Sequence, residues 1–320
     1  MTQALIPLDT ALHLPAIWEE EQQTAKTYAR EQHAKATRRA YESDIRIFAM
    51  WCQNRGLHSL PAASETVAVF LSSQAEEGVS VSTLARRVAA IKYLHSLAGQ
   101  EPPTGSELVK ATLKGIKRTL GAFKNPKSPA TAEKMIEMLR LIPNTLQGKR
   151  DKALLLLGFA GAFRRSELAS LKVDDLSEGE LGFRVMIRKS KTDQEGQGHE
   201  IAIYNGKLKT MEAVKEWLAA ANITEGYLFR PLKKGGKVLE QPLAAESVAD
   251  IVKKYAELAG FIAQEYAGHS LRSGFITSAA ERGASLFKMM EVSRHKSVDT
   301  LKGYVRKAEL FKDHAGAGFL

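Results

Sequence analysis

The sequence predicts a mainly α-helical protein of two domains, the first all-helical and the second helical with a small β-sheet. The chain has 320 residues, 44% of them hydrophobic, which is enough apolar surface for more than one core. Apolar residues recur at helical spacing along most of the chain, and only the region 182–204 is typical of paired strands. The stretch 121–131 combines Gly, Pro, Asn and Lys, a composition that favours a linker between the domains.

The first domain, over residues 25–122, carries four helical patterns after a weakly patterned arm at 1–24. The first pattern places Ile45, Phe48 and Trp51 at three- and four-residue spacing, so that they form one apolar face. The next three patterns begin at Ser64, at Ser80 or Ser82 as the capping residue, and near Ser106.

The second domain, over residues 131–320, follows a linker at 123–130. Its two expected strands, at 182–188 and 200–204, flank a polar turn. Helical patterns precede and follow these strands at 131–142, 149–163, 207–221, 245–259, 271–283 and 297–310.

Several classes of protein are excluded by simple features of the chain. Its single cysteine, Cys52, allows no intrachain disulfide and no cysteine-rich zinc site. The first residues lack the basic start and long apolar stretch of a signal peptide. The longest apolar run, 153–163, covers 11 residues, whereas a membrane span needs roughly 20. We therefore expect a soluble, cytoplasmic protein with no membrane partner.

Basic residues outnumber acidic ones by 46 to 36, and the surplus is concentrated in one region. Between residues 81 and 127, nine Lys and Arg side chains are opposed by two acidic ones. Such a stretch is either a solvated basic face or a surface that follows a nucleic-acid backbone, where each neutralised phosphate releases counterions. The side chains expected to contact DNA, without reading its sequence, are Arg86, Arg87, Lys92, Lys114, Lys117 and Arg118.

Familiar nucleotide and metal signatures are missing from the sequence, which has no Walker loop, no Rossmann glycine fingerprint and no HExxH motif. Three other segments carry residues that can act on an anion. In the first, Arg164 and Arg165 directly follow an apolar helix, and an arginine buried there needs an anion or an acidic partner. For this segment alone, a salt bridge to Glu167 is the simpler explanation.

The second segment, HSLR, places His269 and Arg272 three residues apart on one helix face, at a helix N-terminus that favours anions. The third, at 293–306, places His295 nine residues before Tyr304 in a basic setting. Considered singly, His269 and Arg272 are an ordinary surface pair, and Tyr304 is an ordinary core residue of an amphipathic helix.

Together and in this order, the three segments resemble the tyrosine recombinase, or phage integrase, family over most of residues 30–320. RRSEL is similar to the family's first arginine box, HSLR to its HxxR box, and RHKSVDTLKGYVR to its final histidine-to-tyrosine segment. Each box is moderately specific, and the ordered set is strongly specific. The resemblance implies an all-helical DNA-clamping domain followed by a mixed α/β catalytic domain.

The resemblance assigns the main catalytic roles to Arg164, His269, Arg272, His295 and Tyr304. Tyr304 takes the position of the nucleophile, and His295 the position held by histidine or tryptophan. Arg165 competes with Arg164 as the first-box arginine and is disfavoured by its register against SEL.

Two further residues follow from the resemblance. The family places a lysine on a β-hairpin turn, where Lys191 fits best and Lys189 is the alternative, and Glu167 is similar to its supporting acidic residue. One departure is that Ser-Arg precedes His295 where many members have Leu-Gly. We expect this departure to affect local packing more than the role of His295.

These residue types suit displacement at a phosphodiester. Two guanidiniums can bind the non-bridging oxygens with forked hydrogen bonds, and His295 can add another. A phenol has a reference pKa of about 10, so Tyr304 needs a proton acceptor, for which His269 is placed. Lys191 is expected to protonate the leaving 5′-oxygen. A covalent 3′-phosphotyrosine preserves the bond energy, so neither ATP nor a metal or other cofactor is expected.

The partner implied by the resemblance is double-stranded DNA with inverted-repeat sites, bound by a homotetramer that exchanges strands through a Holliday junction. The partly apolar tail at 309–320 is expected to dock on a neighbouring protomer or, alternatively, on its own domain. Two rivals remain: a type IB topoisomerase, which the compact helical first domain disfavours, and a catalytically silent DNA-binding regulator. All six catalytic residues are present, which disfavours the regulator.

Overall fold

The computed structural model describes residues 16–121, 127–188 and 198–308. The chain divides into two compact units, residues 1–124 and 125–320, which are described separately below. The mainly helical fold with one small sheet in the second unit confirms the predicted fold class. Among the described helices, none is long and apolar enough to cross a membrane.

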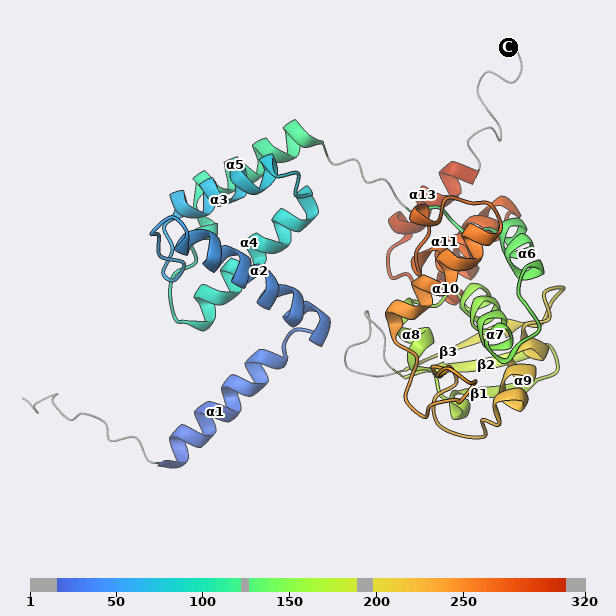
Figure 1. Cartoon of the computed structure of the whole chain (residues 1–320). Helices are drawn as coiled ribbons and strands as arrows, with labels where there is room; N and C mark the ends of the chain where they lie inside the picture. The colour runs from blue at the N-terminus through green and yellow to red at the C-terminus, as the bar shows by residue number, and fades with distance from the viewer. Residues whose placement is uncertain (1–15, 122–126, 189–197, 309–320) are drawn as a thin grey trace, which may run out of the picture. The chain divides into compact units, whose positions relative to one another are not determined.

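The first unit is built from helices alone over its described residues (Figure 1). They are α1 (Ala16–Glu31), α2 (Lys35–Gln53), α3 (Ser64–Glu76), α4 (Val81–Leu97), the 3-10 turn Pro103–Gly105 and α5 (Glu107–Leu120). Ser80 and Ser106 cap α4 and α5, since each hydroxyl accepts a hydrogen bond of 3.3 Å from a first-turn N–H. The core lies between α2, α3 and α4, where Phe48 and Phe70 place their ring centroids 5.0 Å apart.

Helix α1 begins inside the segment 1–24 that we expected to be a weakly patterned arm. Its sequence is rich in Glu, Ala and Gln, which favour helix without a strong apolar pattern. Trp18 and Tyr28 in this helix are exposed, at 45% and 74%. Hydrophobic periodicity gives no signal for such a helix.

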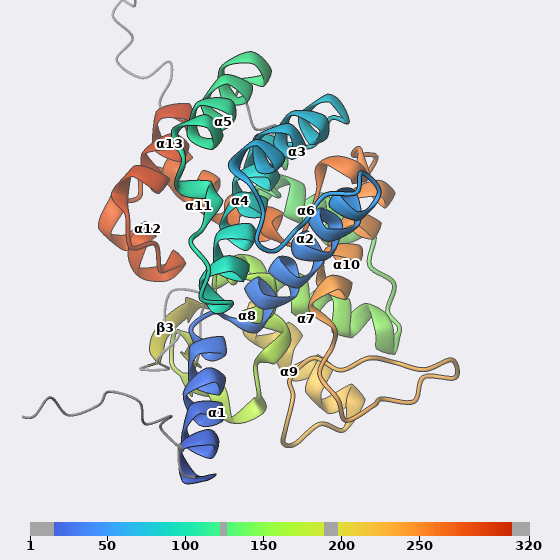
Figure 2. The ribbon, with the colours of Figure 1, turned by 90° about the vertical axis from the view of Figure 1, so that its left-hand side faces the viewer.

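The second unit combines a three-stranded antiparallel sheet with helices (Figure 1). Its helices are α6 (Ala132–Arg140), α7 (Leu146–Ala160), α8 (Arg165–Ser170), α9 (Thr210–Ala221), α10 (Ala245–Leu258), α11 (His269–Glu281), α12 (Leu286–Ser293) and α13 (Val298–Ala308), with 3-10 turns at Val173–Asp175 and Ala263–Glu265. The sheet lies at the lower end of the unit in Figure 1, and α11, α12 and α13 lie together, with α12 also next to β3 (Figure 2).

The sheet has the order β1 (Leu176–Gly179), β2 (Gly182–Ile187), β3 (His199–Tyr204). Val185 and Phe183 on β2 pair with buried isoleucines of β3 and point into the core, whereas the intervening residues of β2 are exposed. This alternation is what predicted the two strands. β1 was not predicted, because LSEG is short and polar.

Helix α7 is the centre of the second unit, with four successive leucines, 154–157, fully buried. Gly158 in this helix has two close neighbours: a Cβ there would lie 2.8 Å from the side chains of Leu168 on α8 and Leu271 on α11. Only a residue without a side chain allows this approach. It holds α8 and α11, which carry the first two motifs, against the same helix.

Candidate active site

The first motif sits where α7 gives way to α8. The turn 161–163 is buried, and Ala162 adopts a left-handed backbone with φ 44°. Arg164 then caps α8: its backbone N–H donates to Glu167 Oε2 at 2.9 Å, and its Nη1 donates to Glu167 Oε1 at 2.7 Å. Glu167 is 3% exposed, so Arg164 is held by a buried carboxylate. Arg165 is exposed and the stem of its side chain lies against Gly268, whereas Arg164 is the arginine that pairs with the buried Glu167.

The second motif forms the first turn of α11. Arg272 is 1% exposed, its Nη1 donates to the carbonyl of Ala162 at 2.7 Å, and its Nη2 lies 3.3 Å from the ring nitrogens of His295. Burial, with the positive charges of Arg164 and Arg294, lowers the pKa of Arg272 to about 9. Desolvation first, and then the neighbouring cations, disfavour the charge of this guanidinium, so it gains from an anion.

His269 precedes Arg272 by one helical turn and reaches solvent. Desolvation by the surrounding protein, followed by the charges of Arg272 and Arg164, lowers the pKa of His269 below its ordinary value of 6.5. At neutral pH the imidazole is therefore uncharged and able to accept a proton.

The third motif begins just after α12, where His295 packs against Arg272. Burial and the neighbouring cations lower the pKa of His295 to about 4, so its ring is neutral at pH 7. The hydroxyl of Ser293 donates to the carbonyl of Met289 at 2.5 Å and lies 2.8 Å from His295 Nδ1. Because that hydroxyl has one proton and gives it to Met289, it accepts from Nδ1–H, which assigns the free lone pair of His295 to Nε2.

Tyr304 is half-buried on α13 and packs on the small cluster formed by Ile276, Met289 and Leu301. Burial raises the pKa of the Tyr304 phenol, and the charge of Arg272 acts in the opposite direction. The tyrosine is therefore protonated at neutral pH, and the cation beside it favours the phenolate that a reaction would require.

The structure thus brings together five of the six predicted catalytic residues, together with Glu167. Charged side chains of one motif shift the pKa values of residues in the other motifs, so the three motifs lie close enough to interact. The sixth, Lys191, and its alternative Lys189 lie outside the described residues. The stem of their hairpin is fixed by Arg188, whose Nε donates to the buried Asp175 at 2.5 Å.

Sequence reasoning missed one residue of this cluster. Arg294, whose position we expected to affect packing only, is 8% exposed and pairs with Glu167 at 2.9 Å. The site therefore holds three guanidiniums, those of Arg164, Arg272 and Arg294, around one carboxylate. The available signal was a basic residue where many relatives have glycine, and it says nothing about where the side chain points.

The basic region of the first unit contains both exposed and buried side chains. Lys92, Lys114, Lys117 and Arg118 are exposed, and Arg86 is exposed although it forms a two-bond pair with Asp44. Arg87 is 8% exposed, donates to Gln74 and lies against the Phe70 ring. Our prediction that Arg87 contacts DNA does not fit this burial, because its guanidinium is used to join α4 to α2 and α3.

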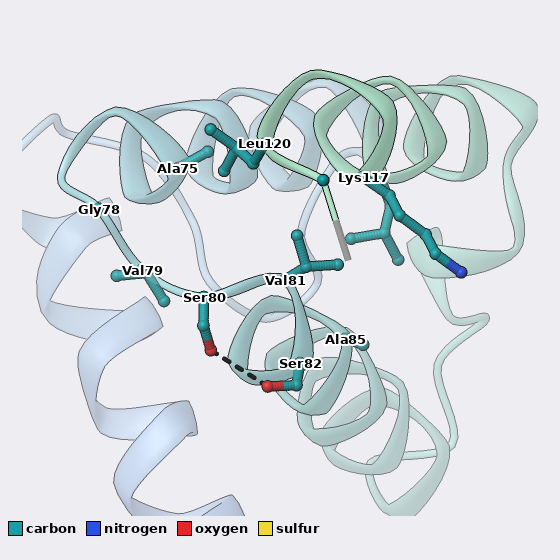
Figure 3. Close-up of a pocket in the computed structure, with 11 residues that line it drawn as sticks. Ala75, Gly78, Val79, Ser80, Val81, Ser82, Ala85, Lys117 and Leu120 are labelled. Carbon is teal, nitrogen blue, oxygen red and sulfur yellow. Dashed lines mark hydrogen bonds between the residues drawn. The ribbon is translucent and has the colours of Figure 1, made fainter. Parts of the chain in front are cut away.

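A groove of about 740 Å³ lies beside these basic residues, between the end of α3, the start of α4 and the end of α5 (Figure 3). Its lining is mostly Ala, Val, Leu, Gly and Ser, and its charged member, Lys117, directs its ammonium away from the apolar wall (Figure 3). The groove lacks groups for chemistry, so the cluster in the second unit is the candidate active site. Among the described residues, no three His, Cys, Asp or Glu side chains are grouped so that they could hold a metal.

Comparison with known proteins gives the class. Residues 130–310 match the model of the phage integrase family, and residues 23–101 match that of the phage integrase N-terminal SAM-like domain. The chain therefore belongs to the phage integrase family of tyrosine recombinases, as the three motifs predicted.

Two curated relatives resemble the chain over most of their length. It is 38% identical to an integrase/recombinase XerD homolog of Selenomonas ruminantium, over 91% of this chain and 87% of the relative. It is 30% identical to the tyrosine recombinase XerD of Bifidobacterium longum, over 85% of this chain and 86% of the relative.

Solved structures share the fold. The XerH site-specific recombinase bound to a palindromic difH substrate matches with a TM-score of 0.60 and 19% identity, over 80% of this chain and 72% of that one. A lambda integrase dimer bound to a core site matches with a TM-score of 0.55 and 17% identity, over 90% and 94%.

Proposed function

We propose that this chain is a site-specific DNA recombinase that cuts and rejoins strands through a 3′-phosphotyrosine on Tyr304. The observation that carries the proposal is the excess of buried positive charge around Arg272, which has two further guanidiniums and one carboxylate beside it. Burying three cations beside one carboxylate is costly, so the cluster gains from a further anion, and Tyr304 and two neutral histidines border it. A phosphodiester supplies both the anion and an electrophile.

The reaction requires one bond to form and one to break at phosphorus. The Tyr304 oxygen attacks the phosphorus and its proton passes to His269, whose lowered pKa keeps it neutral and able to accept. The bond from phosphorus to the 5′-oxygen breaks, and Lys191 protonates the leaving oxygen. Rejoining reverses these transfers with the 5′-hydroxyl of another strand as nucleophile, so the bond energy is retained without ATP or a metal.

Charge stabilisation falls to the arginines. Negative charge grows on the non-bridging oxygens during attack, and donors fixed in advance are worth most where water is excluded. Arg272 is fixed by the Ala162 carbonyl and Arg164 by Glu167, so neither has to reorganise when the charge develops. His295 adds a hydrogen bond to a non-bridging oxygen once its Nε2 takes up a proton.

The DNA partner is double-stranded and contains two inverted repeats. A homotetramer holding two such sites would cut one strand per protomer in turn and pass through a Holliday junction. Exposed lysines on α4 and α5 would follow the phosphate backbone of a DNA half-site without specifying its sequence. Support comes from the named relatives, one of which was solved on a palindromic DNA substrate.

The test begins with selection of bound duplexes from random DNA. A nicked duplex carrying the selected site then traps the covalent intermediate, because the short fragment that carries the new 5′-hydroxyl diffuses away and cannot rejoin. We expect a covalent protein–DNA adduct with the wild type and none with Tyr304→Phe, which keeps the ring and loses the nucleophile. Tyr255→Phe, which removes a buried phenol that is bonded to Asp151 and belongs to none of the three motifs, is the matched control and should still form the adduct.

Absence of an adduct on a duplex that the wild type binds would refute the proposal. Relaxation of supercoiled plasmid that lacks the selected site would favour a type IB topoisomerase activity instead. Binding without either reaction would favour a silent regulator.

A further inference from the structure

Arg294 occupies a backbone position that suits glycine. It follows α12 as its C-cap with φ 56° and ψ 40°, the left-handed conformation in which a side chain is strained. Glycine would end the helix there without that strain. The arginine side chain must therefore supply something that offsets the strain.

The guanidinium of Arg294 binds the turn that leads to the first motif. Nη1 donates to the carbonyl of Gly161 at 3.1 Å, and Nη2 donates to the carbonyl of Ala162 at 3.2 Å and to Glu167 Oε2 at 2.9 Å. The group also lies 5.2 Å from the Phe163 ring centre. One side chain thus binds the turn before Arg164 and the carboxylate after it.

Glu167 is shared between two arginines. Its Oε1 accepts from the side chain of Arg164, and its Oε2 accepts from Arg294 and from the backbone N–H of Arg164. The carbonyl of Ala162 is shared in the same way, between Arg272 and Arg294. Both phosphate-binding arginines of the proposed reaction are therefore connected to Arg294 through one intermediate group.

We infer that Arg294 is a positioning residue of the active site, which fixes Arg164 through Glu167 and Arg272 through the Ala162 carbonyl while its backbone places His295. This inference rests on the proposed function. Arg294 is too deeply buried to touch DNA itself, so it acts through these groups. Its charge also belongs to the positive field that keeps His295 and Arg272 at lowered pKa.

Removing the guanidinium while keeping the backbone should misplace the two arginines. Without Arg294, Glu167 keeps one cationic partner and the carbonyl of Gly161 loses its side-chain donor. The turn at Ala162, itself in a left-handed conformation, is then free to relax. A displacement of reacting groups by about 1 Å costs on the order of 100-fold in rate.

The test compares Arg294→Gly with the wild type on the nicked duplex carrying the selected site. Glycine suits the left-handed cap, but Glu167 loses one of its two cationic partners, so we expect a lower melting temperature. Below the unfolding transition we expect unchanged DNA affinity and adduct formation about 100-fold slower under single turnover. Added guanidinium ion should restore part of the rate, and urea, its neutral isostere, should not. Arg294→Lys should remain slow, because an ammonium lacks the fork that reaches two carbonyls and a carboxylate at once.

Arg282 provides the matched control. It too is the C-cap arginine of a helix, α11, and its guanidinium binds the Ser278 carbonyl and Glu133. It is 58% exposed on its side chain and belongs to none of the motifs. Arg282→Gly should cleave at the wild-type rate.

Each outcome decides the matter. Equal cleavage rates for wild type and Arg294→Gly, with both forming adduct, would overturn the role of Arg294 and leave the proposed function intact. A slower rate accompanied by an equal loss of DNA affinity, with no rescue by guanidinium, would make Arg294 a purely structural residue and also overturn the inference. A wild type that binds the duplex and forms no adduct would refute the proposed function and this role with it.

Discussion

Replacing Glu167 by glutamine should destabilise the second unit, because this carboxylate joins two arginines inside the protein. Three hydrogen bonds end on it, at 2.7, 2.9 and 2.9 Å, and two of them come from guanidiniums. A hydrogen bond to a charged group contributes about 1.5–3 kcal/mol, and removing one partner of a buried ion pair costs about 3–5 kcal/mol. Glutamine keeps the shape and one acceptor oxygen, so we expect a loss of about 3 kcal/mol.

Amide hydrogen exchange measures this loss within the second unit alone. The buried leucines of α7 report on opening of its core, and a change of about 3 kcal/mol makes their exchange roughly 100-fold faster at pH 7. Glu133→Gln removes an exposed carboxylate that also pairs with an arginine and should change exchange by no more than about threefold. Exchange in Glu167→Gln that matches this control would refute the reasoning.

The pH dependence of the free energy of unfolding provides a second test of the role of Glu167. Buried between Arg294 and Arg164, Glu167 has a pKa below its ordinary value of 4.5 in the folded chain. A lowered folded pKa contributes stability that is complete above the unfolded pKa and is lost as pH falls through the folded one. Glu167→Gln should therefore lack that part of the acid-induced loss, and a wild-type-like slope below pH 4.5 would contradict the assignment.

Three further predictions concern cleavage and binding. Arg272→Lys should slow adduct formation by roughly 100- to 1000-fold with little change in DNA affinity, since a fixed donor to the developing charge is lost; a rate within tenfold of wild type would contradict the role. Because the pKa of His269 is lowered from 6.5, the single-turnover cleavage rate should hold as pH falls from 7 to 6.5 and decline only below that, whereas a decline centred above pH 7 would exclude His269 as the proton acceptor. Lys92→Ala and Lys117→Ala should each reduce the slope of log affinity against log salt by about one, and Arg87→Ala should lower the melting temperature and leave that slope unchanged.

The sequence was sufficient to predict the elements that have a clear apolar spacing or a capping residue. Phe48 and Trp51 lie in the core that their spacing predicted, and Ser80 and Ser106 cap the helices expected to follow them. The fold class and the family are confirmed, because the motifs were recognised as an ordered set. The roles of the site residues remain predictions that the adduct experiments test.

Other features depend on contacts that no local pattern encodes. α1 has no strong apolar pattern, and α12 is eight residues long and lies between two longer helices. The burial of Arg87 depends on Asp44, Gln74 and Phe70, which come from two other helices. Whether an arginine is a surface cation or an internal brace is decided by such distant partners, so charge counting along the chain assigned Arg87 to the wrong group.

The hydrogen bond from His295 to Ser293 has a thermodynamic consequence for DNA binding. With Nδ1–H given to Ser293 and a pKa of about 4, His295 has an unprotonated Nε2, which faces Arg272 Nη2 at 3.3 Å and cannot donate to a phosphate oxygen. The negative charge of a phosphodiester favours protonation of that nitrogen, so binding of the scissile phosphate should take up a proton from solution. Calorimetric titration in two buffers of different ionisation enthalpy would reveal this uptake as a difference in heat that His295→Gln abolishes. Equal heats in both buffers would mean that the ring stays neutral. If the uptake occurs, His295 becomes a hydrogen-bond donor only when the phosphate is bound. Without the phosphate its ring stays neutral and adds no further positive charge to the three arginines.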